Sequence, residues 1–212
     1  ECAVSLRRRD GVELRALRAQ LQPAELGEVL LAVAAGGGRD PLRGLSRSPR
    51  WPSHVEALVR HQLRAAVRLD DATQRVLRAP AWPDSRRQAL LLEVIATTGS
   101  RFIEHNVPFP TREAWSAASQ VSRQGFIKAL RGRLFNAQLE PAGVTERSVG
   151  FDVSACRFVE LCHELGRPHL AAMFCEADSR YFAQHTELIE LRRTRTQARD
   201  ATPCDFRFTL RA

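Results

Sequence analysis

The sequence has no apolar run long enough to cross a membrane. Its longest apolar stretches are VLLAVAA at 29–35 and ALLLEVIA at 89–96, whereas a membrane span needs about 18 such residues or more. The first ten residues, ECAVSLRRRD, contain no apolar segment followed by a cleavage site, so they do not resemble a secretory signal. We therefore expect a cytoplasmic protein with no membrane partner.

Lysine is almost missing from the chain. Lys128 is the single lysine among 32 basic residues, which outweigh 24 acidic residues and give a net charge of +8. The densest basic stretches lie apart, at 7–9, 43–50 and 192–195, and no aromatic residues alternate with them. Nucleic-acid binding requires a concentrated basic surface or a recognition motif. We therefore expect a solvated, arginine-rich surface and no nucleic-acid partner.

Several motifs that carry chemistry are also absent. The sequence has no phosphate-binding P-loop, no dinucleotide glycine pattern, no G-x-S-x-G turn, and no C-x-x-C or H-x-x-x-H pair. We therefore expect neither a cofactor nor a metal. The five cysteines are odd in number and irregularly spaced, which favours reduced thiols over disulfides. Four of them gather in the C-terminal third, namely Cys156, Cys162, Cys175 and Cys204.

Apolar residues recur at helical spacing through the first two thirds of the chain. Pro23 is typical of a helix start and Gly36 of a helix end, whereas 37–52 lacks any periodicity and predicts a mobile connection. We expect a last, long helix from Thr111 to the residues before Pro141. Its predicted apolar face consists of Phe126, Ile127, Leu130 and Leu134. Residues 1–141 should thus form a helical N-terminal region.

The periodicity changes after Pro141. Apolar and polar residues alternate near 146–153 and 204–211, which predicts strands, and 187–196 becomes rich in strand-forming residues. Two helical segments, 155–166 and 168–185, lie between the first two strands. Residues 142–212 should form a small three-stranded antiparallel sheet in the order β-α-α-β-β. The whole chain is therefore predicted to be an α+β protein, with its helical part and its sheet in one compact unit.

The stretch MFCEADSRYF, at 173–182, places a carboxylate on an apolar helix face. Asp178 lies four residues after Phe174 and four before Phe182, and Cys175 lies one turn before it on the same face. A buried aspartate is unfavourable unless it is paired, hydrogen-bonded or used in chemistry. The structural alternative is an Asp178 that holds an arginine or backbone amides, with Cys175 packing as a small apolar side chain.

The C-terminal motifs resemble those of the L-2-amino-thiazoline-4-carboxylic acid hydrolase family. The matching pieces are VSACRFVELCHELG with Cys156, FCEAD, the Arg-Thr-x-Thr pattern from Arg193 to Thr196, and the terminal CDFRF. Together they cover the last quarter to third of the chain. One departure is QARDATP at 197–203, where the family usually has glycine. The pattern also resembles, more remotely, the 4-vinyl-reductase-type small-molecule-binding domains.

The resemblance implies hydrolysis of a small heterocyclic, cyclic amidine-like substrate in amino-acid or secondary metabolism of a bacterial type. The family's namesake opens a 2-aminothiazoline ring to give N-carbamoyl-cysteine. On this reading Asp178 holds the amidinium or moves protons, and Arg193 binds a substrate carboxylate with Thr194 or Thr196 orienting it. Cys175 attacks as a thiolate or lines the site while water attacks; Cys156, at a helix start, is the rival nucleophile.

Other functions stay open at this point. A cyclase or isomerase that forms the heterocycle is one alternative, and a non-catalytic small-molecule-binding module is another. A reactive thiol in the pocket favours an enzyme, whereas buried, inert thiols favour a binding module. A homo-oligomer remains possible. The deciding observation is whether Cys175, Asp178 and Arg193 meet at one cavity.

Overall fold

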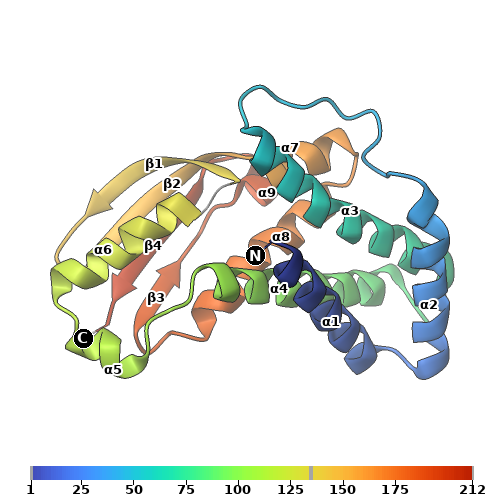
Figure 1. Cartoon of the computed structure of the whole chain (residues 1–212), viewed down its shortest axis with the longest axis horizontal. Coiled ribbons are helices and arrows are strands. Elements are labelled where there is room, and N and C mark those ends of the chain that lie inside the picture. Colours follow the sequence, from blue (N-terminus) through green and yellow to red (C-terminus); the bar gives the residue numbers. More distant parts are fainter. Residues whose placement is uncertain (1, 134–135, 212) are drawn as a thin grey trace.

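The computed structural model describes residues 2–133 and 136–211, and Leu134, which we expected on an apolar helix face, lies outside them. Helices form most of the N-terminal part, and the β-strands form one sheet toward the C-terminal end (Figure 1). The helices are α1 (Cys2–Gln20), α2 (Pro23–Ala35), α3 (Ser53–Val76), α4 (Asp84–Asn106), α5 (Arg112–Ala117), α6 (Gln120–Leu130), α7 (Arg157–Glu164), α8 (Pro168–Ala183) and α9 (Gln197–Asp200), with 3₁₀ turns η1 (Gly36–Gly38) and η2 (Arg131–Arg133).

The sheet is antiparallel and has four strands in the order β1-β2-β4-β3. These are β1 (Ala137–Val144), β2 (Ser148–Cys156), β3 (Ile189–Arg192) and β4 (Cys204–Leu210). This confirms the α+β class and the predicted order of β2, α7, α8, β3 and β4, but the short helix α9 between β3 and β4 was not expected and the count of three strands was wrong. Residues 137–141, which we expected at the end of a long helix, belong to edge strand β1. Its alternation is weak and it contains Pro141, so pairing with β2, rather than its own pattern, specifies it.

The long helix expected from Thr111 is divided. The Thr111 side chain caps α5 by accepting a hydrogen bond from the Ala114 amide, as its position predicts. The helix then breaks at Ala118, where the backbone is extended, and resumes as α6. The two short helices lie over the sheet, and Trp115 and Ile127 point into the same core as the strands.

One face of the sheet is buried and the other is polar. Val149, Phe151 and Val153 of β2 point inward, as do Phe206 and Phe208 of β4. Between them on the strands, Arg207 and Asp152 form an ion pair of 2.7 Å on the opposite face. This alternation is what the period-two pattern predicts for a sheet covered by helices on one side.

The buried side chains form two clusters, and α8 contributes to both. Leu170 and Met173 pack among α1 to α4 and α7, whereas Tyr181 and Phe182 pack on the inner face of the sheet. Cys156, at the end of β2, contacts both clusters. Helix α8 therefore joins the helical part to the sheet, and α4 runs beside it (Figure 1).

Glycine permits this close pairing of helices. A Cβ atom at Gly99 of α4 would lie 2.6 Å from the Cβ of Ala177 on α8, a separation that two carbon atoms do not adopt. The two helices can approach each other here only because position 99 has no side chain. The contact lies directly beside the cavity described below.

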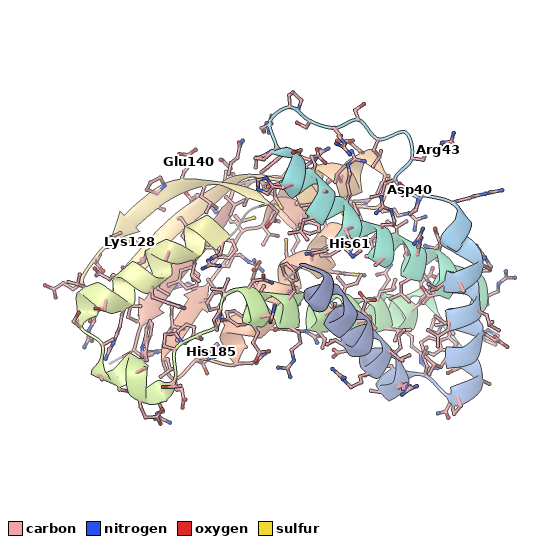
Figure 2. All side chains as sticks on the ribbon, viewed as in Figure 1. Asp40, Arg43, His61, Lys128, Glu140 and His185 are labelled. Atoms are coloured by element: carbon pink, nitrogen blue, oxygen red, sulfur yellow. The ribbon has the colours of Figure 1, made fainter. Side chains whose placement is uncertain are left out.

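Charged side chains are spread over the surface or paired across helices. Asp40 and Arg43 lie close together on the outside of the molecule, and Lys128 and Glu140 lie at the opposite side of it (Figure 2). The irregular connection before α3 is bonded to that helix, since Arg60 donates hydrogen bonds to the carbonyls at 45 and 46. None of the helices in the described part of the chain is both long enough and apolar enough to cross a membrane.

Candidate functional site

A cavity of about 120 Å³ lies where the two clusters of buried side chains meet. Helices α4 and α8 form one side of it, and the ends of β2 and β4 form the other. Its wall is largely aromatic and aliphatic, with a small number of polar groups, which is the usual composition of a small-molecule site. The aromatic lining residues are Phe102, Phe158, Phe174 and Phe206, and the polar ones are Gln62, Asn106, Arg133, Asn136, Asp178 and Arg193, with the thiols of Cys156, Cys175 and Cys204.

Asp178 and Arg193 form an ion pair in this cavity. The Arg193 Nη1 lies 3.1 Å from an Asp178 carboxylate oxygen, and the two side chains are 8% and 20% exposed. Burial raises the pKa of Asp178, and the Arg193 charge and hydrogen bond oppose this rise. Asp178 thus has the cationic partner that a carboxylate on an apolar helix face requires. Its carboxyl group titrates closer to neutrality than an ordinary aspartate.

The Arg193 guanidinium is also tied to the backbone of α8. Its Nη2 donates to the Cys175 carbonyl oxygen at 2.7 Å and to the Ser179 hydroxyl at 3.1 Å. The guanidinium carbon lies 5.0 Å from the centre of the Phe206 ring, a cation–π contact. These contacts hold Arg193 in one orientation against the helix that carries Asp178.

Cys175 lines the same cavity one turn before Asp178. Burial raises the pKa of its thiol, and the nearby Cys156, Asp178 and Cys204 raise it further, whereas Arg193 lowers it. The net direction is upward, so the thiol is protonated at neutral pH. Arg193, which bonds to the Cys175 carbonyl oxygen, is the cation that a nucleophilic Cys175 requires, but burial outweighs its effect on the pKa of the thiol.

Cys156 also lines the cavity, at the end of β2 where α7 begins. Burial raises the pKa of its thiol to about 11, although the amides of Val159 and Phe158 and the Asn136 side chain lower it. The helix start therefore provides the stabilising amides that its position indicates, but desolvation is larger. Cys204 completes the group of thiols; burial raises its pKa too, and its sulfur accepts a hydrogen bond from the Gln197 amide at 3.2 Å.

Thr194 and Thr196 do not line the cavity with the other predicted residues. The Thr194 hydroxyl donates to an Asp205 carboxylate oxygen at 2.6 Å, and the other Asp205 oxygen accepts the amides of Thr194 and Arg195 at 2.9 and 2.6 Å. Thr196 is buried at the start of α9. Asp205 thus connects the two sequence motifs RRTRT and CDFRF, and it fixes the backbone immediately after Arg193.

Sequence reasoning missed Arg133, Asn106 and Asn136 as cavity residues. Arg133 ends η2, and its Nη1 donates to the Asn106 carbonyl oxygen at the end of α4, at 3.3 Å. Asn136 donates to the Cys156 sulfur at 3.6 Å. None of the segments that carry these three residues contains a motif, and α4 reaches the cavity only through tertiary packing. No pattern in the sequence could have assigned these residues to the site.

Among the described residues, no three His, Cys, Asp or Glu side chains are arranged to hold a metal ion. The arrangement can bind a small, partly flat molecule against the aromatic wall and place one carboxyl group against it.

The fold and the cavity define an α+β protein with a small-molecule-sized site between its helices and its sheet. Comparison with known families then gives a more particular answer. The family model of L-2-amino-thiazoline-4-carboxylic acid hydrolase matches residues 109–208, and so confirms the resemblance seen in the motifs. The matched segment contains α5 to α9, strands β1 to β3, β4 as far as Phe208, and all the predicted site residues.

No curated protein matches the chain. One solved structure, described as "Modulating Heme Redox Potential Through Protein-Induced Porphyrin Distortion", is similar over 95% of this chain and 93% of its own, with 10% sequence identity and a TM-score of 0.37. At that TM-score the likeness carries no argument about fold or ligand.

Proposed function

We propose that the protein is a hydrolase that opens a small cyclic amidine-like ring, such as a 2-aminothiazoline, in this cavity. The observation that carries the proposal is the Asp178–Arg193 pair inside an otherwise apolar cavity, in the segment that matches the hydrolase family. A carboxylate in such a place can bind an amidinium through charge-assisted hydrogen bonds. The aromatic wall can pack against a flat ring.

Asp178 is the group that we assign to proton transfer. Water attacks the ring carbon between the sulfur and the two nitrogens, and its proton passes to Asp178. The tetrahedral intermediate then collapses with cleavage of the carbon–sulfur bond, and the leaving sulfur takes the proton from Asp178. Because the substrate enters as the amidinium, its ring nitrogen already carries a proton, and the hydroxyl proton of the intermediate passes to solvent as the carbonyl forms. The products are a urea-type carbonyl group, a free thiol and one proton released to solvent. A raised pKa suits a carboxyl group that must both accept and return a proton.

We favour water over a cysteine as the nucleophile. A thiolate at Cys175 or Cys156 would have to form against raised pKa values, which burial causes at both positions. Water needs no such ionisation when a carboxylate accepts its proton. On this scheme both cysteines shape the apolar wall around the ring.

The first test is Asp178→Asn, assayed with 2-amino-thiazoline-4-carboxylic acid. We expect kcat to fall by about 100-fold or more, because the amide cannot accept a proton, while the variant remains folded. The wild-type rate should rise as pH increases through the pKa of Asp178, above the ordinary 3.8, because the carboxylate is the active form. The control is Glu187→Gln, which removes an exposed carboxylate that pairs with Arg112 outside the cavity lining. Equal activity of Asp178→Asn and wild type would contradict the proposal.

The second candidate is a non-catalytic small-molecule-binding module. The protonated, buried thiols favour it, because nothing in the cavity is then an activated nucleophile. Calorimetry and product analysis on one sample distinguish the two candidates. Binding of the thiazoline without release of a free thiol would identify a binding module, whereas thiol release with turnover would identify the hydrolase.

A further inference from the structure

We propose that Arg133, and not Arg193, binds the carboxylate of the substrate, and that Arg193 is a positioning residue for Asp178. This inference rests on the proposed function and specifies its substrate class. The substrate would be a zwitterion, with a cationic amidinium end at Asp178 and an anionic end at Arg133. The family resemblance implied the opposite use of Arg193, so the two assignments can be separated by experiment.

The contacts of Arg193 argue against its use as an anion clamp. Three of its five N–H groups are already used by Asp178, Cys175 and Ser179. The guanidinium is 8% exposed, and its positive charge is balanced by the Asp178 carboxylate. A substrate carboxylate that approached Arg193 would also approach Asp178 and be repelled by it. The ion pair therefore orients Asp178 through one carboxylate oxygen, Oδ2, and most donors of Arg193 are used before an anion arrives.

Arg133 differs from Arg193 in each of these respects. It is exposed, and it borders the cavity from the end of η2. Its bond to the Asn106 carbonyl holds it at the C-terminal end of α4, where the helix dipole favours a cation. Within the described residues, no carboxylate lies within ion-pair distance of its guanidinium. Its charge is thus available to a ligand.

Arg133 and Asp178 also border a second, smaller space. An adjoining cavity of about 20 Å³ is lined by both of them, together with Ile103, Val107 and Phe206, and all five line the main cavity as well. Two opposite charges therefore face one small apolar space. A five-membered ring with an amidinium on one side and a carboxylate on the other presents the complementary charges across a similarly small distance.

The test compares two substrates in three proteins. The substrates are 2-amino-thiazoline-4-carboxylic acid and 2-aminothiazoline, which lacks the carboxylate. The proteins are wild type, Arg133→Gln and the control Arg101→Gln, which removes an exposed charge of α4 that pairs with Glu104 outside the cavity. Arg133→Gln should raise KM for the carboxylate substrate by about 10- to 100-fold, the usual effect of losing a charged hydrogen bond. The loss should be selective, so that KM for 2-aminothiazoline, which has no carboxylate for Arg133 to bind, rises much less than KM for the carboxylate substrate.

Arg133→Lys should recover part of the loss, because lysine keeps the charge but not the planar pair of donors. Arg193→Gln should lower kcat for both substrates and shift the pH profile, as expected of a residue that positions Asp178. The inference would be wrong if Arg133→Gln had the same KM as wild type for the carboxylate substrate and Arg193→Gln raised KM for that substrate alone. The proposed hydrolase function would not be affected by this result. If wild type binds the carboxylate compound without turnover, the proposed hydrolase function is wrong. The affinity of Arg133→Gln for this compound, measured by calorimetry, then still tests the role of Arg133. If wild type binds neither compound, the proposed function and the role of Arg133 are both wrong.

Discussion

At the scale of single residues, the cavity is unusual in holding three thiols next to an ion pair. Cys156, Cys175 and Cys204 are close enough to Asp178 or to one another for their charges to interact. Each thiolate would disfavour the others, and burial disfavours all of them. Arg193 is the cation that opposes this trend, and it is committed to Asp178. The site therefore favours a single negative charge, on Asp178, over a charge on sulfur.

Cys175→Ser tests this reading of the thiols. We expect kcat/KM within about 10-fold of wild type, because a protonated thiol that lines a wall can be replaced by a hydroxyl of similar size. A covalent nucleophile, in contrast, typically loses several orders of magnitude on such a change. Steady-state kinetics on the thiazoline substrate measures the difference.

The rate of alkylation gives an independent measurement of how reactive the thiols are. With raised pKa values, Cys175 and Cys156 should react slowly with iodoacetamide at pH 7, and turnover should persist during this slow labelling. Fast labelling of Cys175 with loss of turnover, and protection by substrate, would instead support covalent catalysis. Fast labelling of Cys156 would transfer that role to it.

At the scale of elements, the contact between α4 and α8 sets the shape of the cavity. Gly99→Ala should lower the free energy of unfolding by about 1–3 kcal/mol, because its Cβ would lie 2.6 Å from that of Ala177 and the two helices must move apart. Urea denaturation measures the change. The control is Gly27→Ala in α2, where the added Cβ meets nothing within 4 Å; it should be neutral or stabilising by up to about 1 kcal/mol. Equal effects of both changes would contradict the packing argument.

The turn after β3, which Asp205 holds through its hydrogen bonds to Thr194 and Arg195, is the second contact between elements that shapes the site. Asp205→Asn should destabilise the protein by about 1–3 kcal/mol, because it weakens the bonds to the Thr194 hydroxyl and to the amides of Thr194 and Arg195. Because this turn follows Arg193, kcat should fall as well. Asp152→Asn, which disrupts a half-exposed pair with Arg207, is the control and should change stability by less than about 1 kcal/mol. Unchanged kcat in Asp205→Asn would show that the turn does not position the site.

At the scale of the whole molecule, ion pairs with buried carboxylates connect α3 to α4, to α7 and to the residue before α8. Glu56 and Arg157 lie 2.7 Å apart with side chains 2% and 1% exposed. The fully buried Asp70 pairs with Arg87 of α4 at 3.1 Å and with the less buried Arg167 at 2.7 Å. Breaking one of them leaves a buried charge without its partner, which is more unfavourable than losing an exposed pair.

Glu56→Gln should therefore lower the free energy of unfolding by about 3 kcal/mol at pH 7, whereas Glu190→Gln, in an exposed pair with Arg211, should change it by less than about 1 kcal/mol. Hydrogen bonds from Ser48, Arg157 and Arg60 lower the pKa of Glu56 below its ordinary 4.5, against the effect of burial. Its contribution is thus complete above that value and is lost as pH falls through the lowered pKa. Denaturation at pH 7 and pH 3 should show a smaller difference between wild type and Glu56→Gln at pH 3. An unchanged difference would contradict the assignment.

The sequence by itself determined the class of the fold, and the period of its apolar residues is the reason. Alternation in β2 and β4 and helical spacing in α8 follow from which side chains must leave water, and this depends only on local order along the chain. The same local rule placed Cys175 and Asp178 on one face, because they lie one turn apart on one helix. β1 escaped this rule, since an edge strand with a proline takes its structure from its neighbour.

Only the tertiary structure decided which partners complete the site. Arg193 meets Asp178 because Asp205, on another strand, turns the chain after β3. Arg133 and Asn136 border the cavity through their contacts with Asn106 of α4 and with Cys156 of β2, both distant in the sequence. The pKa values of the thiols likewise depend on burial, which is a property of the assembled core and not of any short stretch of sequence. Local sequence patterns could identify Asp178 as the carboxylate of the site, but the charged groups around it are brought there by contacts between distant segments.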